Sequence, residues 1–292
     1  MVRIAVIGLD TSHVPEFAKR LQSPDCESAL RVEGAAMATC LRFTTPFQSD
    51  EGLNERQRML ESLGVAVTTD FDLAVRDCDA VAIMINDPSR HLEFFARCLG
   101  LGKPIFLDKP MADSIESGRA IYRLAQENGA RVLCSSSLRF APQLVAACDD
   151  VGTPVFATVY GPLGRAPAGS SIVWYGVHAF EMLQRALGRG ARQVFARTDG
   201  AGVVAIVEYG DSRRGVVELS ENTGLYGGCL RSVDRVASFQ ADVAEAYSEQ
   251  LRAVVRFFQG CEAPLEIEDT LEVLALLDAA QRSVDVGRPA RL

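Results

Sequence analysis

Hydrophobic positions in the first 140 residues form short continuous runs that alternate with amphipathic segments. Runs at 2–8, 32–40, 65–68, 80–86, 104–107 and 131–135 predict strands. Several are apolar throughout, as parallel strands covered on both faces must be. Stretches with helical periodicity lie between them, at 15–21, 51–63, 89–99 and 114–128. Strands that alternate with helices imply right-handed crossovers, so the pattern predicts a doubly wound parallel sheet of the Rossmann type.

After about Phe140 the pattern changes. Strand-like segments at 154–160, 193–198, 203–209 and 215–220 are joined mainly by short polar turns, which indicates an antiparallel sheet. Helices are predicted at 177–187, about 241–258 and 269–283. The fold class is therefore α/β, with a Rossmann nucleotide-binding domain at 1–140. An α+β domain for substrate binding and oligomerisation, with a largely antiparallel open sheet, follows at 141–292. Its last helix, 269–283, could pack back on the first domain.

Charge and cysteine usage narrow the class of partner. The chain of 292 residues carries a formal net charge of −8, which argues against a nucleic-acid partner. No apolar run approaches the roughly 20 residues of a membrane span. The eight cysteines are scattered without a C-x-x-C pair, which favours buried thiols over disulfides or a metal site. We therefore expect a cytoplasmic protein with no bound metal.

The turn after the first strand is the place where such folds bind a pyrophosphate. A full fingerprint would have glycine at 8, 10 and 13, and only Gly8 is present. Asp10 brings a negative charge to the phosphate position, and His13 stands where a small residue usually lets helix and strand pack closely. Thr11 and Ser12 could donate hydroxyl hydrogen bonds to a phosphate. Alternatively, Asp10, Thr11 and Ser12 cap the first helix.

The end of the second strand usually carries an acid that holds the adenosine ribose. This chain has no acid there, since Glu33 lies at the opposite end of the strand. Arg42 follows the strand and could receive the 2′-phosphate of NADP, although a lone loop arginine is also found simply solvated. The sequence therefore leaves the cofactor as NAD or NADP.

Further segments of the chain follow one another in a characteristic order. They are Pro88 with His91 after the fourth strand, GKPIFLDKPMA (102–112), SLRF (137–140), YGVHAFEML (175–183) and EDTLEVLALLDAAQRSVDVGRP (268–289). Together with the opening strand and turn they resemble the glucose–fructose oxidoreductase / inositol dehydrogenase (Gfo/Idh/MocA) family over nearly the whole chain. The resemblance implies a Rossmann domain followed by an α/β domain with an open sheet. It also implies NAD(P)-dependent oxidation or reduction of sugars and polyols.

The resemblance assigns roles residue by residue. Lys109 matches the family's active-site lysine, and His178 matches the histidine of its helix motif. The family often has an aspartate four residues before that histidine, where this chain has Trp174, and Glu181 matches the aspartate after it. A divergent branch of oxidoreductases has a similar GLDTSH turn and WYG-x-H segment, in which case these departures form one coherent variant.

The candidate site comprises two further sets beside the catalytic pair Lys109 and His178. The predicted substrate-binding residues are Arg139, Trp174, Tyr175 and Glu181. The predicted cofactor-binding residues are Gly8, Leu9, Asp10, Thr11, Ser12, His13, Arg42, Asn86, His91 and Lys109.

The chemistry of the catalytic pair can be argued from its position. Lys109 follows a buried strand, and burial near a cofactor would lower its pKa and let it bond or deprotonate a substrate hydroxyl. His178 and Glu181 are three residues apart on one helix face, so Glu181 could orient the imidazole while His178 accepts a proton. The alternatives are a surface lysine after a strand and an ordinary polar helix face. His91 would more simply anchor its own helix.

Three functions are compatible with these residues. The first is an NAD(P)-dependent oxidoreductase that acts on a sugar, polyol or related alcohol or ketone. The second is a non-redox lyase or hydrolase that retains NAD for transient oxidation. The third is a nucleotide- or sugar-binding protein of the same fold without catalysis. The expected partners are a small sugar-like substrate and a second copy of the chain, in a homodimer or homotetramer, with neither nucleic acid nor membrane.

Overall fold

A computed structural model describes residues 1–292, and the chain folds into two compact units. The first unit comprises Met1–Ala112, Glu116–Cys134 and Tyr247–Ile267. The second comprises Asp113–Ile115, Ser135–Ala246 and Glu268–Leu292. The division falls between residues 134 and 135, whereas the sequence pattern places it after 140. A late segment also belongs to the first unit, so neither unit is one continuous stretch of chain.

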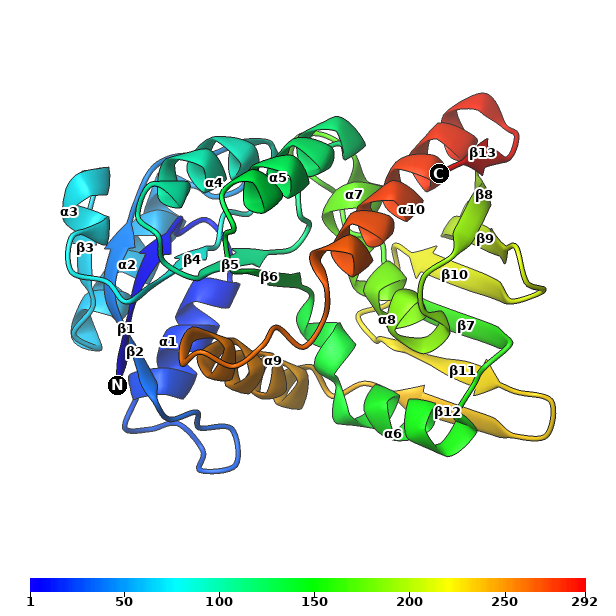
Figure 1. Cartoon of the computed structure of the whole chain (residues 1–292), viewed down its shortest axis with the longest axis horizontal. Coiled ribbons are helices and arrows are strands. Elements are labelled where there is room, and N and C mark those ends of the chain that lie inside the picture. The colour runs from blue at the N-terminus through cyan, green and yellow to red at the C-terminus, as the bar shows by residue number, and fades with distance from the viewer. The chain divides into compact units, whose positions relative to one another are not determined.

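The first unit contains a parallel sheet of six strands in the order β3-β2-β1-β4-β5-β6 (Figure 1). This order is the one typical of dinucleotide-binding domains, with the ligand at the carboxyl ends of the strands. Runs predicted from apolar continuity match these strands. β4, β5 and β6 are buried on both faces, whereas the edge strand β3 is not. Their bounds are β1 Val2–Ile7, β2 Ala35–Leu41, β3 Ala66–Thr68, β4 Ala80–Ile83, β5 Ile105–Asp108 and β6 Val132–Ser135.

Helices cover both faces of this sheet. In Figure 1, α4 and α5 lie on one face, and α1 and α9 lie on the other. The connecting helices are α1 His13–Gln22, α2 Asp50–Ser62, α3 Phe71–Val75, the 3-10 turn η1 Pro88–Arg90, α4 His91–Leu99 and α5 Ile115–Glu127.

Helix α9 (Val243–Phe258) explains why residues 247–267 belong to the first unit. The Arg20 guanidinium of α1 donates to Ser248 Oγ at 3.1 Å, and its carbon Cζ lies 5.3 Å from the Tyr247 ring centroid. The Phe17 ring meets the Tyr247 ring edge-on at 6.3 Å. Arg131 donates to the carbonyl of Phe257 at 2.7 Å. These partners lie more than a hundred residues apart in sequence, so local periodicity gives no sign of the contact.

The second unit contains a seven-stranded sheet in the order β12-β11-β7-β10-β9-β8-β13. β7 and β10 are parallel, and the other neighbouring strands are antiparallel. The predicted, largely antiparallel sheet is thus confirmed. The strands are β7 Phe156–Pro162, β8 Ala191–Thr198, β9 Gly202–Tyr209, β10 Arg214–Ser220, β11 Gly227–Arg231, β12 Val236–Gln240 and β13 Ala290–Arg291. The helices are η2 Ser137–Phe140, α6 Pro142–Val151, α7 Ser171–Trp174, α8 Val177–Leu187 and α10 Ile267–Val286.

Helix α10 is hydrogen-bonded to β8 and α8 of the second unit. Ser283 Oγ accepts from the Ala196 backbone N–H of β8 at 2.8 Å, and Gln184 of α8 donates to Asp269 at 2.9 Å. The sequence left open that this helix packs back on the first domain. In the structure the late segment that joins the first unit is 247–267 instead.

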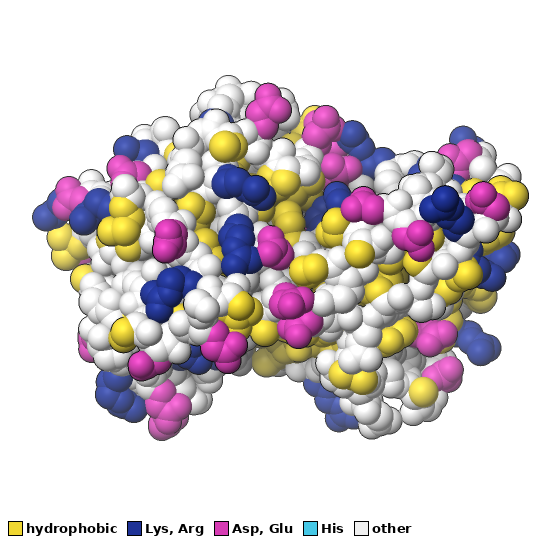
Figure 2. All heavy atoms as spheres, turned by 90° about the horizontal axis from the view of Figure 1, so that it is seen from below, with side chains coloured by type: hydrophobic (Ala, Val, Ile, Leu, Met, Phe, Trp, Pro, Cys, Tyr) yellow, Lys and Arg dark blue, Asp and Glu magenta, His cyan; other side chains and the backbone are white.

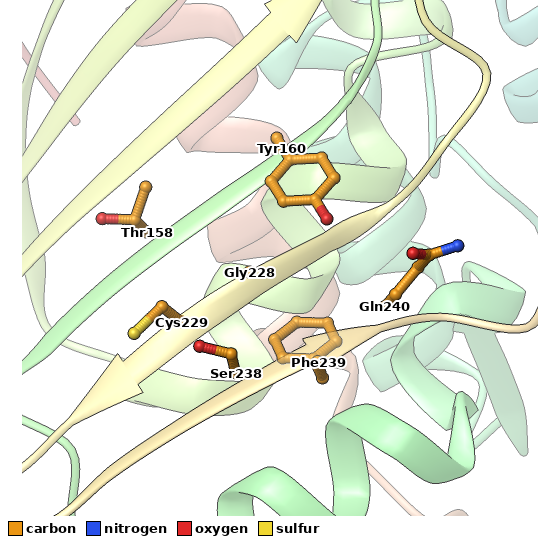
Figure 3. A pocket seen from close by; sticks show the side chains of 7 residues that line it. All are labelled: Thr158, Tyr160, Gly228, Cys229, Ser238, Phe239 and Gln240. Atoms are coloured by element: carbon orange, nitrogen blue, oxygen red, sulfur yellow. The ribbon is translucent and has the colours of Figure 1, made fainter.

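Helices α6, α8 and α10 lie on one face of the second sheet, and the opposite face is open (Figure 1). Along β7 and β9 buried and half-buried residues alternate, as expected when only one face is covered. A row of mostly apolar side chains crosses the open face, formed by Cys229, Thr158, Val216, Ile206 and Phe195. Beside it lies a depression of about 510 Å³, lined by Thr158, Tyr160, Gly228, Cys229, Ser238, Phe239 and Gln240 (Figure 3).

Charged side chains of both signs are mixed over the molecular surface. Figure 2 shows Lys and Arg side chains interspersed with Asp and Glu, without one broad patch of either sign on the visible face. None of the helices combines the length with the apolar character that crossing a bilayer requires.

Candidate active site

The β1–α1 turn is shaped by Gly8. Its φ is +106°, and a Cβ at this position would lie 2.4 Å from the Met84 carbonyl oxygen. A side chain is therefore excluded both by the backbone conformation and by the close approach of β4. Leu9, the next residue, is fully buried, and its carbonyl accepts from the Arg56 guanidinium of α2 at 3.0 Å.

The Asp10 carboxylate is bonded within the fold, whereas the sequence suggests that its negative charge lies where a phosphate would bind. Its side chain is buried, and its carboxylate accepts from the Asn86 backbone N–H at 2.8 Å and the Thr45 hydroxyl at 2.7 Å. The carboxylate thus joins the loops that follow β1, β2 and β4. Burial raises the pKa of Asp10, although the hydrogen bonds from Asn86 and Thr45 act in the opposite direction.

The start of α1 differs from the capping interpretation. Thr11 Oγ1 accepts from the His13 N–H at 3.2 Å, but the Ser12 side chain makes no cap hydrogen bond and is exposed. The Ser12 hydroxyl and the turn amides form a donor set that suits a dinucleotide phosphate, with the helix dipole in its favour. The residues of this turn therefore fit the cofactor that the fold implies.

His13 forms a buried ion pair at the end of β5. Its Nδ1 lies 2.7 Å from Asp108 Oδ2, with side chains 5% and 1% exposed. Burial alone would raise the pKa of Asp108. The charge and hydrogen bond of His13, together with the charge of Lys109, outweigh the effect of burial, so the pKa of Asp108 is lowered. The imidazole also meets the Tyr247 ring edge-on at 5.1 Å. The large residue that replaces a glycine here thus has a partner of its own.

Lys109 lies directly after β5, at the carboxyl edge of the sheet, and is only 5% exposed. Burial lowers its pKa, while the negative charges of Asp108 and Asp10 act in the opposite direction. The interpretation as an exposed surface lysine is wrong, because a solvated ammonium would not be buried beside two carboxylates. A lysine of this kind suits proton exchange.

His91 and Arg42 have partners within the fold. The two ring nitrogens of His91 lie 2.7 Å and 3.3 Å from the carbonyl oxygens of Ile85 and Met111, in a fully buried position. His91 therefore holds together the loops after β4 and β5, as its alternative anchoring role suggests. Arg42 is half-buried and donates to Gln57 Oε1 of α2 at 2.6 Å. It stays a candidate for the adenosine end of the cofactor.

His178 of α8 forms a hydrogen bond with Ser136, a residue that the sequence pattern did not single out. Its Nδ1 lies 2.7 Å from the Ser136 hydroxyl, which follows β6 in the same unit. His178 is 5% exposed and Ser136 is fully buried. Tyr175 and Tyr226 approach the imidazole edge-on, with centroid distances of 5.4 Å and 5.5 Å.

Glu181 does not orient the imidazole directly, so that expectation is wrong. One carboxylate oxygen accepts from the Ser136 backbone N–H at 3.3 Å, and the other accepts from Arg139 at 3.0 Å. Both side chains are buried. Burial raises the pKa of Glu181, and the Arg139 charge opposes this. Glu181 and Arg139 therefore act on His178 through Ser136.

Trp174 closes the short helix α7 and is half-buried. Its ring lies 5.1 Å from the Tyr175 ring, which in turn meets His178. The position of the family's usual aspartate is thus part of an aromatic group beside the imidazole. It offers a flat surface rather than a second carboxylate.

The strand order, the glycine turn and the buried lysine define a dinucleotide-binding Rossmann domain, followed by an α+β domain with an open sheet. Residues 2–136 match the model of the GFO_IDH_MocA family, which is described as an oxidoreductase family with an NAD-binding Rossmann fold. The predicted family, enzyme class and nicotinamide cofactor are thereby confirmed. No curated protein matches the chain in sequence.

Solved structures share the fold over the whole chain. One is GenD2 from gentamicin A biosynthesis in complex with NAD, at 16% identity and TM-score 0.80, covering 100% of this chain and 96% of its own. A myo-inositol dehydrogenase from Corynebacterium glutamicum has 16% identity and TM-score 0.80, with coverages of 100% and 99%. An oxidoreductase from Agrobacterium radiobacter, in complex with NAD+, L-tartaric acid and magnesium, has 16% identity and TM-score 0.77, with coverages of 99% and 98%.

Proposed function

We propose that this protein transfers a hydride between NAD(P) and a sugar, polyol or related alcohol or ketone. The observation that carries the proposal is Lys109, a lysine with 5% exposure and a lowered pKa at the carboxyl edge of the Rossmann sheet. Ligands of open α/β sheets bind at this edge. A lysine there can exist as the neutral amine that accepts a proton from a hydroxyl.

The bound nicotinamide would supply the hydride chemistry. The chain's own residues would hold the substrate and move its proton, with Lys109 and His178 as the acid–base candidates. The Ser12 hydroxyl and the turn amides would bind the cofactor phosphates. Because Arg139 forms an ion pair with Glu181, in this proposal it stabilises the site and does not bind the substrate.

The substrate class rests on the aromatic group and on the structural relatives. Trp174 and Tyr175 present ring faces and edges beside His178, which suits stacking on a sugar or cyclitol ring. The relatives include a myo-inositol dehydrogenase and an oxidoreductase with bound L-tartaric acid. Myo-inositol and tartaric acid are both small polyhydroxylated molecules, which supports a substrate of this class for the present chain.

Cofactor binding is tested first, by thermal unfolding and calorimetry with NAD+, NADH, NADP+ and NADPH. Ligand at about 100 times its dissociation constant should add roughly 2.7 kcal/mol to the free energy of unfolding. Protein freed of bound nucleotide that responds to none of the four forms would contradict the proposal.

Turnover is tested next, with a panel of inositols, sugars, sugar acids and tartrate, read by nicotinamide absorbance. Stoichiometric change of free cofactor supports the oxidoreductase. Conversion of substrate without net cofactor change would instead favour the transient-oxidation lyase or hydrolase. Cofactor binding without any conversion would favour a binding protein.

A further inference from the structure

The hydroxyl group of Ser136 has two hydrogen-bond partners in the structure. Ser136 Oγ accepts a hydrogen bond from the Leu138 backbone N–H at 3.2 Å, which caps η2. Its other neighbour is His178 Nδ1 at 2.7 Å. A serine hydroxyl has one proton to donate, and Leu138 supplies a donor, so the only acceptor within reach of that proton is Nδ1. Leaving a fully buried hydroxyl proton without an acceptor would be costly.

The backbone at Ser136 is held as firmly as its side chain. Its N–H donates to Glu181 Oε1 at 3.3 Å, and Arg139 donates to the other oxygen of the same carboxylate at 3.0 Å. Glu181 and His178 both come from α8, so the carboxylate fixes Ser136 relative to the imidazole. This arrangement leaves little freedom for the hydroxyl to turn elsewhere.

The orientation of the His178 imidazole ring is also fixed. Tyr175 and Tyr226 pack edge-on against it, with interplanar angles of 77° and 71°. With Nδ1 directed at Ser136, the other nitrogen, Nε2, lies on the far edge of the ring. In the neutral imidazole one nitrogen accepts while the other carries the proton.

We propose that Ser136 is a positioning residue that keeps neutral His178 in the tautomer protonated on Nε2, so that His178 acts on a substrate as a hydrogen-bond donor and not as a base. This inference rests on the proposed function. During alcohol oxidation the substrate O–H bond breaks and its proton passes to the neutral Lys109 amine. The nicotinamide, when bound, would supply the hydride chemistry, and Nε2 keeps its proton throughout.

The tautomer is tested directly by nitrogen-15 NMR of protein with labelled histidine. The measurement is made at about pH 8.5, roughly two units above the ordinary histidine pKa, because the two nitrogens of a neutral imidazole give distinct shifts. The chain has three histidines, so a His178→Gln variant identifies the signals. We expect Nε2 protonated and Nδ1 accepting. A proton on Nδ1 overturns the inference, without any bearing on whether the protein is an oxidoreductase.

Variants of Ser136 provide the second measurement. Ser136→Ala should abolish the single tautomer and lower kcat about tenfold, with the cofactor Kd unchanged. Ser136→Thr keeps the hydroxyl and should restore the Nε2–H signal. Ser137→Ala, at an adjacent serine that is 1% exposed, is the matched control and should leave tautomer and rate as they are. If Ser136→Ala retains the tautomer, Ser136 is not the group that sets it.

Because the NMR measurement needs no substrate, the two proposals fail separately. Absence of turnover over the whole substrate panel would count against the oxidoreductase, whatever the tautomer. The wrong tautomer in an active enzyme would count against the role of Ser136 alone.

Discussion

Two residues in the first turn contradict the glycine fingerprint, and each is matched by another residue of the same unit. Asp10 is paired with the Thr45 hydroxyl and the Asn86 amide, and His13 is paired with Asp108. A buried charge is tolerated when it is paired and hydrogen-bonded. The altered turn is therefore a consistent variant of the fold rather than a damaged phosphate site.

The acid–base pair gives the first prediction at this scale. Lys109→Ala and His178→Ala should each spare cofactor binding and slow turnover by roughly 10²–10⁴-fold, the usual worth of a positioned acid or base. We expect Lys109→Ala to be at least as severe, since the neighbouring carboxylate of the family is replaced by Trp174. The double variant should lose less than the sum, because residues that act on the same substrate hydroxyl work as a unit. Steady-state rates on a substrate from the panel, beside nucleotide Kd values, check this. Near-normal turnover in both single variants would show that the catalytic site lies elsewhere.

The burial of Lys109 gives a second prediction, on pH dependence. Because its pKa is lowered, the neutral amine forms below the ordinary lysine value of about 10.4. The kcat/KM for alcohol oxidation should therefore rise with pH and level off below that value. The Asp108 charge raises the pKa of Lys109, so Asp108→Asn should move the rising limb to lower pH. A profile that is unchanged in Lys109→Ala would assign the limb to another group.

The sequence could identify Lys109 and His178, because they lie in recognisable segments next to predicted elements. It could not identify Ser136 as the partner of His178. Nor could it identify Thr45 as the partner of Asp10, or Asp108 as the partner of His13. The partner of Ser136 is 42 residues away and that of Thr45 is 35 residues away, and neither contact leaves a periodic signal. The one available sign was that Ser136 follows a buried strand directly and comes just before SLRF.

At the scale of elements, the β1–α1 turn depends on a glycine for reasons independent of any ligand. Gly8→Ala should destabilise the fold by more than ~2 kcal/mol, since the left-handed φ alone costs an alanine about 1–2 kcal/mol and the new Cβ would meet the Met84 carbonyl. Gly64→Ala is the matched control. Its φ is +83°, but no atom lies within 4 Å of the added Cβ, so it should show only the conformational cost. Equal losses in urea denaturation would mean that the close approach to β4 is not the cause.

The reliability of the sequence pattern differs between the two sheets. The strands of the first sheet were predicted because their residues are apolar on both faces. In the second sheet β11 begins with Gly227-Gly228, and β12 buries only Phe239, so neither produces a clear alternation. Helix α6 was missed because it follows η2 almost directly and begins at Pro142. The parallel pairing of β7 with β10 depends on the tertiary fold rather than on turn chemistry.

At the scale of the whole molecule, the open face of the second sheet calls for a partner. A row of mostly apolar side chains crosses it, and Phe195 is 37% exposed. Monomers rarely leave a contiguous apolar patch to solvent, and closed symmetric pairing covers such a face economically. We propose that two copies meet through this surface, in a homodimer or in a homotetramer built from such pairs.

Light scattering at micromolar concentration tests the assembly. The native protein should have a larger mass in solution than a monomer. The Ile206→Glu variant, altered in the centre of the open face, should be monomeric and should still bind the cofactor. Val233→Glu, at a residue that is 95% exposed in the turn between β11 and β12, is the control and should remain assembled. A monomeric native chain would rule out the proposed pairing.

The return of residues 247–267 to the first unit also sets the order of events on the ribosome. The sheet of that unit is complete once Cys134 has been synthesised, yet α1 then lacks Tyr247 and Ser248. At about 5–20 residues per second, the intervening chain takes roughly 6–20 seconds to emerge. Throughout that interval the nascent first unit exposes the side of α1 that α9 later covers. Its native state becomes available only after most of the second unit has already been made.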